Sequence, residues 1–345
     1  IERGVAERLG PGAGAGAADN GTGAAGTVRV EAFAGTLLVD VCRDLDASVG
    51  KDVSDLEAKR RAKERLDAAL APFRLLAAAW SGGVMLGKDA CDDLAYETLL
   101  RAVAEKGEAA AVVGQSPRLA AMVETGREGV PYDLVFPEVF HPDGSPERRG
   151  FDVVLGNPPW DRTLPSDKEF FAGFDMAVLD SPTKAEGAKR LATLRGSPEI
   201  ESQYRSYLAG FRSLENVMER LFVDQVAVID GEKTIGKLDA FRAFIERNAG
   251  LLGPTGVTGA VVPSAFHANE GATGVRKLYL EKMALRCCFS FENRKLFEIH
   301  ASFKFALVVA GKPGPTTEFP CAFYLHDMDW LFGDRSAREL RYSLE

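Results

Sequence analysis

Ten consecutive residues, Phe151–Trp160, constrain the fold of this chain more than any other segment. They read Phe-Asp-Val-Val-Leu-Gly-Asn-Pro-Pro-Trp, so a short apolar run is followed by a glycine and a rigid turn. A run that is apolar on both faces is typical of a strand buried inside a parallel sheet. Pro158 and Pro159 fix two φ angles and lack N–H donors, so they end the strand. The segment therefore predicts a buried strand with Asn157 at its carboxyl end.

The segments after this run alternate between helical and strand patterns. An amphipathic helix ends at the turn signal Gly253-Pro254, and short apolar runs lie on both sides of a second helix. Strand, helix and strand in this order indicate an α/β sheet of the Rossmann-like class. We expect a helix over 238–252, a strand over 257–262, a helix over 273–285, and strands over 287–291 and 303–310.

The region before the run is expected to be mainly helical, because apolar residues recur there at three- and four-residue spacing. The three expected helices cover 55–80, 92–106 and 117–128. A glycine- and alanine-rich tract precedes them; its match to G-x-G-x-x-G, at Gly21–Gly26, lacks the preceding strand that a dinucleotide fingerprint needs. The expected organisation is a flexible linker over 1–28, a helical region over 29–130, an α/β domain over 131–312 with a helical insertion over 163–236, and a following region over 313–345.

Composition excludes several classes of protein and site. The five cysteines form no C-x-x-C pair, which argues against a zinc site or a disulfide framework and favours reduced thiols in the cytoplasm. The net charge of −8 argues against a surface that is basic all over. The sequence has no apolar run of about 20 residues, the length that a membrane-spanning helix needs. The chain starts at Ile1 rather than Met, which leads us to expect a piece of a longer protein.

The Asn-Pro-Pro-Trp sequence suits a planar amino group. Ligands of open α/β sheets bind at the carboxyl ends of strands, where Asn157 is expected. The Asn157 side-chain oxygen and the Pro158 carbonyl oxygen can accept both hydrogens of an exocyclic amine and orient its nitrogen. Trp160 offers a face on which a base can stack. The alternative is a rigid turn that ends the strand and binds nothing.

Residues 151–160 resemble motif IV of the adenine-N6 DNA methyltransferases. The resemblance extends to Phe136–Phe140, Leu251–Ser264 and Phe291–Phe305, and it points to the large methylases of type IIG-like restriction systems and of BREX-like and DISARM-like phage defence. It implies a partial Rossmann-like methyltransferase fold, S-adenosylmethionine as cofactor, and double-stranded DNA with the target adenine flipped out of the stack.

The resemblance also implies roles for single residues. Asn157 and Pro158 would hold the adenine N6 amine, Pro159 would shape the loop, and Trp160 would stack on the base. Some relatives carry a second aromatic residue after the Val-Val-Pro strand, and Phe266 is the candidate for it here; a place in the core is the alternative.

The cofactor side of such a site has no match in this sequence. Relatives bind S-adenosylmethionine through a glycine-rich loop upstream of motif IV, followed by an acidic residue at the next strand end. Neither feature precedes Asn157, so the cofactor-binding residues are unassigned. We expect a missing N-terminal part of the same protein, or a partner chain, to supply this loop. Subunits of a bacterial restriction or defence system are further expected partners, in the cytoplasm.

Basic residues gather downstream of the motif. Between His267 and Lys312 there are eight Lys or Arg residues and four Glu, with phenylalanines between them. We expect phosphate contacts beside the target base from this segment. The alternative is a solvated helix face next to a buried strand. The candidate substrate-binding residues are Arg294, Lys295, His300 and Lys304.

Other functions fit the same motif. The amine could belong to cytosine N4, to RNA or to a glutamine side chain in a protein. The chain could also be a DNA-binding subunit that retains the fold without turnover.

Overall fold

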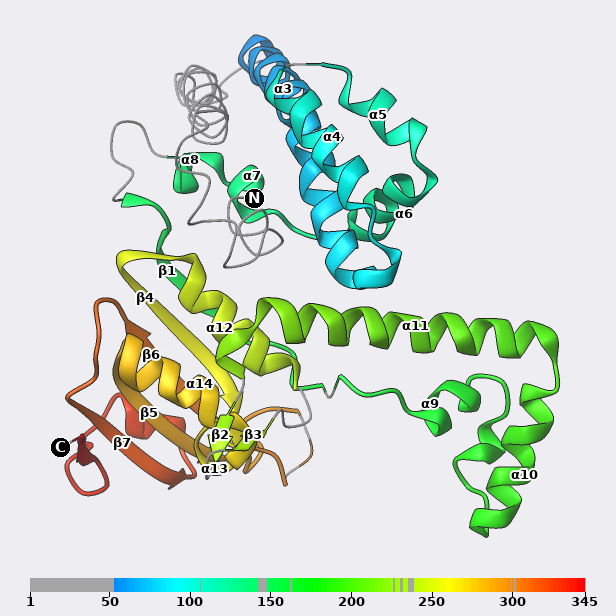
Figure 1. The fold of residues 1–345 in the computed structure, drawn as a ribbon. Helices are drawn as coiled ribbons and strands as arrows, with labels where there is room; N and C mark the ends of the chain where they lie inside the picture. Colours follow the sequence, from blue (N-terminus) through cyan, green and yellow to red (C-terminus); the bar gives the residue numbers. More distant parts are fainter. Residues whose placement is uncertain are drawn as a thin grey trace. The chain divides into compact units, whose positions relative to one another are not determined.

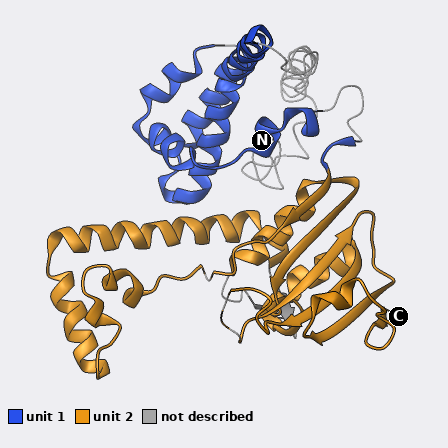
Figure 2. Cartoon of the chain, turned by 180° about the vertical axis from the view of Figure 1, so that it is seen from behind, with its two compact units in different colours: residues 1–151 blue, residues 152–345 orange. Residues whose placement is uncertain are grey.

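The computed structural model describes residues 53–105, 107–141, 148–161, 163–225, 227–229, 232–234, 239–298, 300 and 302–344. The chain divides into two compact units, one ending at Phe151 and one beginning at Asp152 (Figure 2). The predicted linker over 1–28, with its glycine tract, lies outside the described residues, as do residues 29–52 of the expected helical region.

Unit 1 is helical, as predicted (Figure 1). The long helix α3 (Val53–Leu86) supplies most of its core, and Pro72 lies within this helix without ending it. By length and composition α3 is the one helix in the described part of the chain that could cross a membrane. Its buried residues instead pack against the neighbouring helices. The other elements are η1 (Lys88–Ala90), α4 (Asp93–Ala104), α5 (Ala109–Gln115), α6 (Pro117–Gly126), α7 (Tyr132–Val135) and α8 (Pro137–Phe140).

Helices α3 and α6 approach each other at two glycines. A Cβ atom at Gly82 would lie 1.7 Å from the carbonyl oxygen of Met122, and one at Gly126 would lie 2.0 Å from that of Ala78. Only residues without a side chain allow the two backbones to come this close. The crossing therefore depends on glycine at both positions.

Unit 2 is built on a mixed six-stranded sheet, which confirms the α/β class. The strand order is β1-β4-β6-β5-β7-β8. Strand β6 is antiparallel to β4 and β5, while β5 and β7 run parallel. The carboxyl ends of β4, β5 and β7 therefore lie on the same side of the sheet. The strands are β1 (Phe151–Gly156), β4 (Leu252–Pro263), β5 (Ala284–Glu292), β6 (Lys304–Gly311), β7 (Glu318–Leu325) and β8 (Leu340–Ser343).

Both faces of the sheet are covered near its centre. On one face lie α12 (Ala240–Leu251), α13 (Ala265–Ala268), η5 (Glu270–Ala272), α14 (Thr273–Lys277) and η6 (Leu278–Lys282), whose apolar residues form one core with β4, β5 and β6. The phenylalanines of β5 and β6 form a second cluster with Trp160 and with η7 (Met328–Leu331). Helix α12 passes directly into β4, so the turn predicted at Gly253-Pro254 is wrong.

The region over 313–345, expected to begin a following region, instead adds β7 and β8 to this sheet. The range 163–236, where a helical insertion is predicted, contains helices that form a small core of their own around Phe171, Val178 and Tyr204. Its elements are α9 (Asp167–Ala172), η3 (Met176–Val178), α10 (Lys184–Arg195), α11 (Pro198–Leu221) and η4 (Val223–Gln225). The end of the predicted range is a short hairpin, β2 (Ala227–Ile229) and β3 (Glu232–Thr234), rather than a helix.

The prediction that β1 is a buried strand is wrong. Strand β1 is the outermost strand of the sheet and lies beside β4. The side chains of Val153 and Leu155 are 57% and 77% exposed, respectively. The apolar pattern is that of a strand with neighbours on both sides and both faces, whereas β1 pairs on one side alone among the described residues. An edge of this kind can accept another strand.

Candidate functional site

The Asn-Pro-Pro-Trp segment leaves β1 and lies at the carboxyl end of β4. Trp160 Nε1 donates a hydrogen bond to the carbonyl oxygen of Val261, 3.4 Å away and two residues before β4 ends. Pro158 is buried and Trp160 is half-buried, while Asn157 is exposed. The two residues that bury surface fix the loop, and the Asn157 amide is left at the surface where a ligand can reach it.

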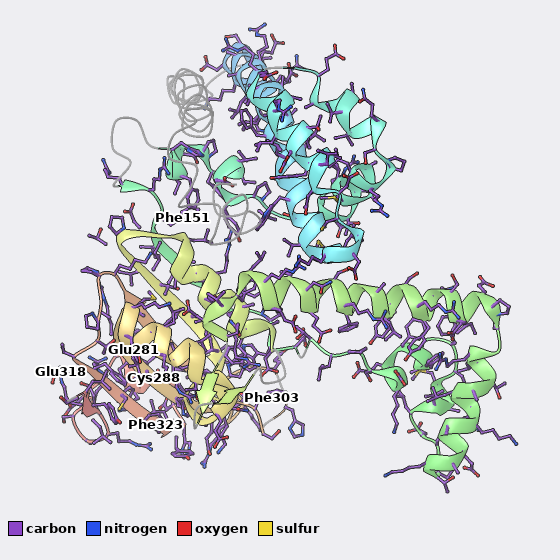
Figure 3. All side chains as sticks on the ribbon, in the orientation of Figure 1. Phe151, Glu281, Cys288, Phe303, Glu318 and Phe323 are labelled. Atoms are coloured by element: carbon purple, nitrogen blue, oxygen red, sulfur yellow. The ribbon has the colours of Figure 1, made fainter. Side chains whose placement is uncertain are left out.

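Aromatic side chains flank Trp160. The rings of Phe291 and Phe305 stack with centroids 5.3 Å apart, and Trp160 packs against the cluster that contains them. The ring of Phe303 lies 6.2 Å from that of Trp160, tilted by 40°. Phe303 is exposed and is labelled in Figure 3. The sequence interpretation included Phe303 only as one of several aromatic residues among the basic ones, and therefore missed it as a candidate site residue.

Asn293 organises the loop between β5 and β6. Its buried side-chain oxygen accepts a hydrogen bond from the Phe297 N–H at 2.9 Å, and its amide donates to the carbonyl oxygens of Phe297 and His300 at 3.2 and 3.4 Å. The Asn293 N–H bonds the carbonyl oxygen of Phe303 at 3.1 Å. One buried amide thus shapes the loop that ends at Phe303.

This loop carries three of the predicted substrate-binding residues. Arg294, Lys295 and His300 are all exposed. His300 Nδ1 lies 2.7 Å from the Ser302 Oγ, an interaction between neighbours that turns the ring toward its own loop. The geometry brings these residues to the same end of the sheet as Trp160, while leaving their roles as predictions.

Lys304, the fourth predicted residue, begins β6 beside the end of β5. Its ammonium lies 2.9 Å from the Glu292 carboxylate, and the Arg294 guanidinium lies 3.6 Å from the same group. The hydrogen bond from Lys304 is the main reason that the pKa of Glu292 is below its usual range, and it raises the pKa of Lys304 in return. The Glu292 carboxylate and the Lys304 ammonium are therefore charged at neutral pH.

The basic segment does not form one surface. Arg286 and Lys312 lie at the opposite end of the strands, where Lys312 Nζ donates to the carbonyl oxygen of Leu252 at 2.9 Å. Arg276 donates hydrogen bonds to the carbonyl oxygens of Phe266 and Asn269, which lie in the segment between β4 and α14. Sequence spacing could not reveal this division, because antiparallel β6 returns the chain to the far end of the sheet.

Phe266 lies in the core. Its side chain is 2% exposed and meets the Tyr279 ring edge to face, with centroids 5.8 Å apart. Of the two interpretations that the sequence left open, this position favours packing. A buried ring in this place cannot present a face to a base without movement of the α13 segment.

His267, next to Phe266, makes a contact that the sequence did not suggest. Its Nε2 lies 2.9 Å from the Oγ of buried Ser290, and its ring lies 5.1 Å from that of Phe323. Burial, assisted by the positive charge of Arg276, lowers the pKa of His267. The imidazole is therefore neutral at pH 7 and acts as a hydrogen-bonding side chain rather than as a cation.

The cofactor side of the site has no counterpart in the described part of the chain. The elements that precede β1 there are helices, without the strand and glycine-rich loop that would cradle S-adenosylmethionine. No group of three or more His, Cys, Asp or Glu side chains within the described ranges could hold a metal ion. Among the described residues, side chains suited to an amine that accepts a transferred group are present, and a loop suited to the cofactor that donates this group is not.

Comparison with known proteins gives no family assignment. No family model matches the chain. No curated protein matches it either. Among solved structures, the chain is similar to a modification subunit described for a type I restriction enzyme from Vibrio vulnificus YJ016, with 10% identity over 91% of this chain and 92% of that one, and a TM-score of 0.28.

Two further structures show similarity at the same level. The DrdV–DNA complex has 11% identity over 84% of this chain and a TM-score of 0.31, and this chain spans 32% of the DrdV chain. The M protein of the type I restriction enzyme EcoKI has 12% identity over 84% of this chain and 71% of that one, with a TM-score of 0.24. TM-scores in this range do not establish a common fold, so function has to be argued from the site.

Proposed function

We propose that this chain forms the base-binding half of a DNA methyltransferase that modifies the N6 amine of adenine in a restriction-modification or phage-defence system. The observation that carries the proposal is the Asn157–Trp160 loop, which combines an exposed amide, a rigid proline pair and an aromatic ring at the carboxyl end of β4. At the same end, Phe303 would offer a second aromatic ring to the flipped base. Lys304 and the basic residues of the loop between β5 and β6 would offer positive charge to its phosphate.

The chain's own residues would orient the amine. The nitrogen lone pair of an exocyclic amine is delocalised into the ring, which makes it a poor nucleophile. Two acceptors, the Asn157 side-chain oxygen and the Pro158 carbonyl oxygen, would hold its two N–H groups and favour a pyramidal nitrogen. Trp160 and Phe303 would hold the ring, since base–aromatic stacking contributes about 1–3 kcal/mol per base.

S-adenosylmethionine is the proposed methyl donor, and its binding loop has to come from a segment other than those described. The open edge of β1 is where we propose that this segment docks. Leu155 and Val153 expose apolar surface there, immediately before Asn157. A segment that pairs with this edge and also packs over the face from which the two residues project would cover both side chains and bring a cofactor loop to the amide. The segment would belong to the same protein or to a partner subunit of the system.

The test is the identity of the methylated product. The protein, together with the polypeptide that supplies the cofactor loop, is incubated with labelled S-adenosylmethionine and with unmethylated DNA, RNA or protein. Digestion to nucleosides or amino acids and mass spectrometry then locates the label. The proposal predicts N6-methyladenine in DNA. Label in N4-methylcytosine, in RNA or in glutamine would replace the substrate, and absence of label from all of them would favour a non-catalytic DNA-binding subunit.

A further inference from the structure

The carboxyl end of β7 contains a β-bulge that turns an aromatic ring out of the sheet. Pairing with β5 shifts by one residue between Phe289/Ala322 and Phe291/Leu325, and Tyr324 lies in the extra step with a φ of 57°. A bulky residue rarely adopts this left-handed conformation. Arg338 stabilises it by donating to the carbonyl oxygens of Phe323 and Tyr324 at 3.2 and 3.0 Å. The Tyr324 side chain is 61% exposed as a result.

The exposed ring lies beside a cluster of charged side chains. The Lys304 ammonium lies 5.0 Å from the centroid of Tyr324. The same ammonium shares the Glu292 carboxylate with Arg294, at 3.6 Å, and with the Nε2 of His326, at 3.1 Å. One carboxylate thus faces two basic side chains and a histidine. Exposed ion pairs of this kind contribute little to stability, so the arrangement calls for another explanation.

This cluster lies at the same end of the strands as the proposed base-binding site. Glu292 ends β5, Lys304 begins β6 and His326 follows β7, so the three residues come from neighbouring strand ends. Lys304 directly follows Phe303, whose ring is 6.2 Å from that of Trp160. Figure 3 labels Phe303 and Phe323, the residues that precede Lys304 and Tyr324. Strand alternation puts Lys304 and Phe303 on opposite faces, so the Tyr324 cluster and Trp160 share one end of the strands, where a nucleic-acid strand that leaves Trp160 and crosses this end would meet Tyr324.

We propose that Tyr324, Lys304 and Arg294 bind the nucleotide next to the target adenine in the acceptor DNA strand. The Tyr324 ring would take the face of that nucleotide's base, and the two cations would take its phosphate, with Glu292 holding them in place until DNA binds. Exposed aromatic rings combined with cations are the usual means of binding unstacked nucleotides. The inference rests on the proposed function, because it takes DNA as the substrate, and it adds a second binding surface to that site.

The test is a DNA-affinity measurement on the full-length protein, which requires no methyl transfer. Fluorescence anisotropy is measured with a labelled duplex that carries an unpaired adenine, over a series of salt concentrations. Tyr324→Asn is the informative variant, because asparagine tolerates a positive φ and removes the ring without adding backbone strain. Tyr342→Asn is the control, since Tyr342 is 56% exposed and lies on β8 of the same sheet.

The inference predicts that Tyr324→Asn weakens binding about fivefold or more, the lower end of what stacking contributes. Tyr324→Phe, which keeps the ring, retains the wild-type affinity, and Tyr342→Asn has no effect. Lys304→Gln reduces the slope of log affinity against log salt by about one. Equal affinities for Tyr324→Asn and Tyr342→Asn, or no binding by the wild type, would overturn the inference. Loss of methylation in Asn157→Ala with DNA affinity unchanged would still support the proposed function, so the two can fail separately.

Discussion

The Asn293 side chain gives the sharpest prediction about the basic loop. It is 1% exposed, and among the described residues it bonds the Phe297 N–H and the carbonyl oxygens of Phe297 and His300. Replacing it with alanine removes the bonds and leaves the Phe297 N–H and the carbonyl oxygens of Phe297 and His300 without that partner. The loop that ends at Phe303 should then lose its fixed shape.

The expected size follows from the bonds themselves. A net contribution of about 1 kcal/mol for each of three bonds gives about 3 kcal/mol. The longest bond, 3.4 Å to the His300 carbonyl, contributes least, so the range is about 2–4 kcal/mol. Asn269→Ala is a matched control, because Asn269 is exposed and its side chain makes a single bond, at 2.8 Å, to the Gly271 N–H. This bond caps the start of η5, and loss of a side-chain cap costs about 1 kcal/mol.

Two measurements check this prediction. Chemical denaturation should give a free energy of unfolding that is about 2–4 kcal/mol lower for Asn293→Ala than for the wild type. Hydrogen exchange followed by mass spectrometry should show faster exchange in residues 294–303, including the Phe297 amide. A change no larger than that of Asn269→Ala, with unaltered exchange in the loop, would refute the role given to Asn293.

Three further predictions concern other parts of the chain. Gly82→Ala should lower the free energy of unfolding by about 2 kcal/mol or more, because its Cβ meets the Met122 carbonyl oxygen, whereas Gly114→Ala in α5, with nothing within 4 Å, should raise it by about 1 kcal/mol; denaturation curves distinguish the two. Burial lowers the pKa of His267, so the unfolded chain takes up this proton first as pH falls below about 6.5, and His267→Gln should lose less stability than the wild type between pH 7 and pH 5. Leu155→Lys should change stability by less than about 0.5 kcal/mol, since the side chain is exposed, yet reduce methylation at least about tenfold if the β1 edge receives the cofactor segment; unchanged methylation would contradict that docking.

Local chemistry explains why much of the fold was predictable. The helix–strand alternation after the motif gave α12, β4, β5 and β6 with correct types, because each has an apolar pattern of its own. Helix α4 starts at a predicted position because Asp92 accepts the Ala95 N–H as an N-cap. The bulge at Tyr324 has no comparable signal, since the Arg338 guanidinium that bonds the Tyr324 carbonyl oxygen comes from outside the strand.

The errors arose where the answer depends on neighbours. The pattern of β1 correctly describes a strand suited to burial, but its exposure is set by which chain segments lie beside it. The sequence alone did not distinguish Phe303 and Lys304 from the rest of the basic segment. The antiparallel course of β6 does so, because it places one end of that segment at the same end of the strands as Trp160 and the other end away from it. Periodicity carries neither kind of information.

The rate of adenine methylation by Asn157→Ala decides whether this amide takes part in methyl transfer. The full-length protein, with the polypeptide that supplies the cofactor loop, is assayed for N6-methyladenine formed in unmethylated DNA, and DNA affinity is measured on the same preparations. Loss of one group that positions the reacting atoms typically slows chemistry by about a hundredfold or more. We predict a loss of that size with DNA affinity unchanged. A variant that methylates adenine as fast as the wild type would contradict the assignment of Asn157 and the account built on it.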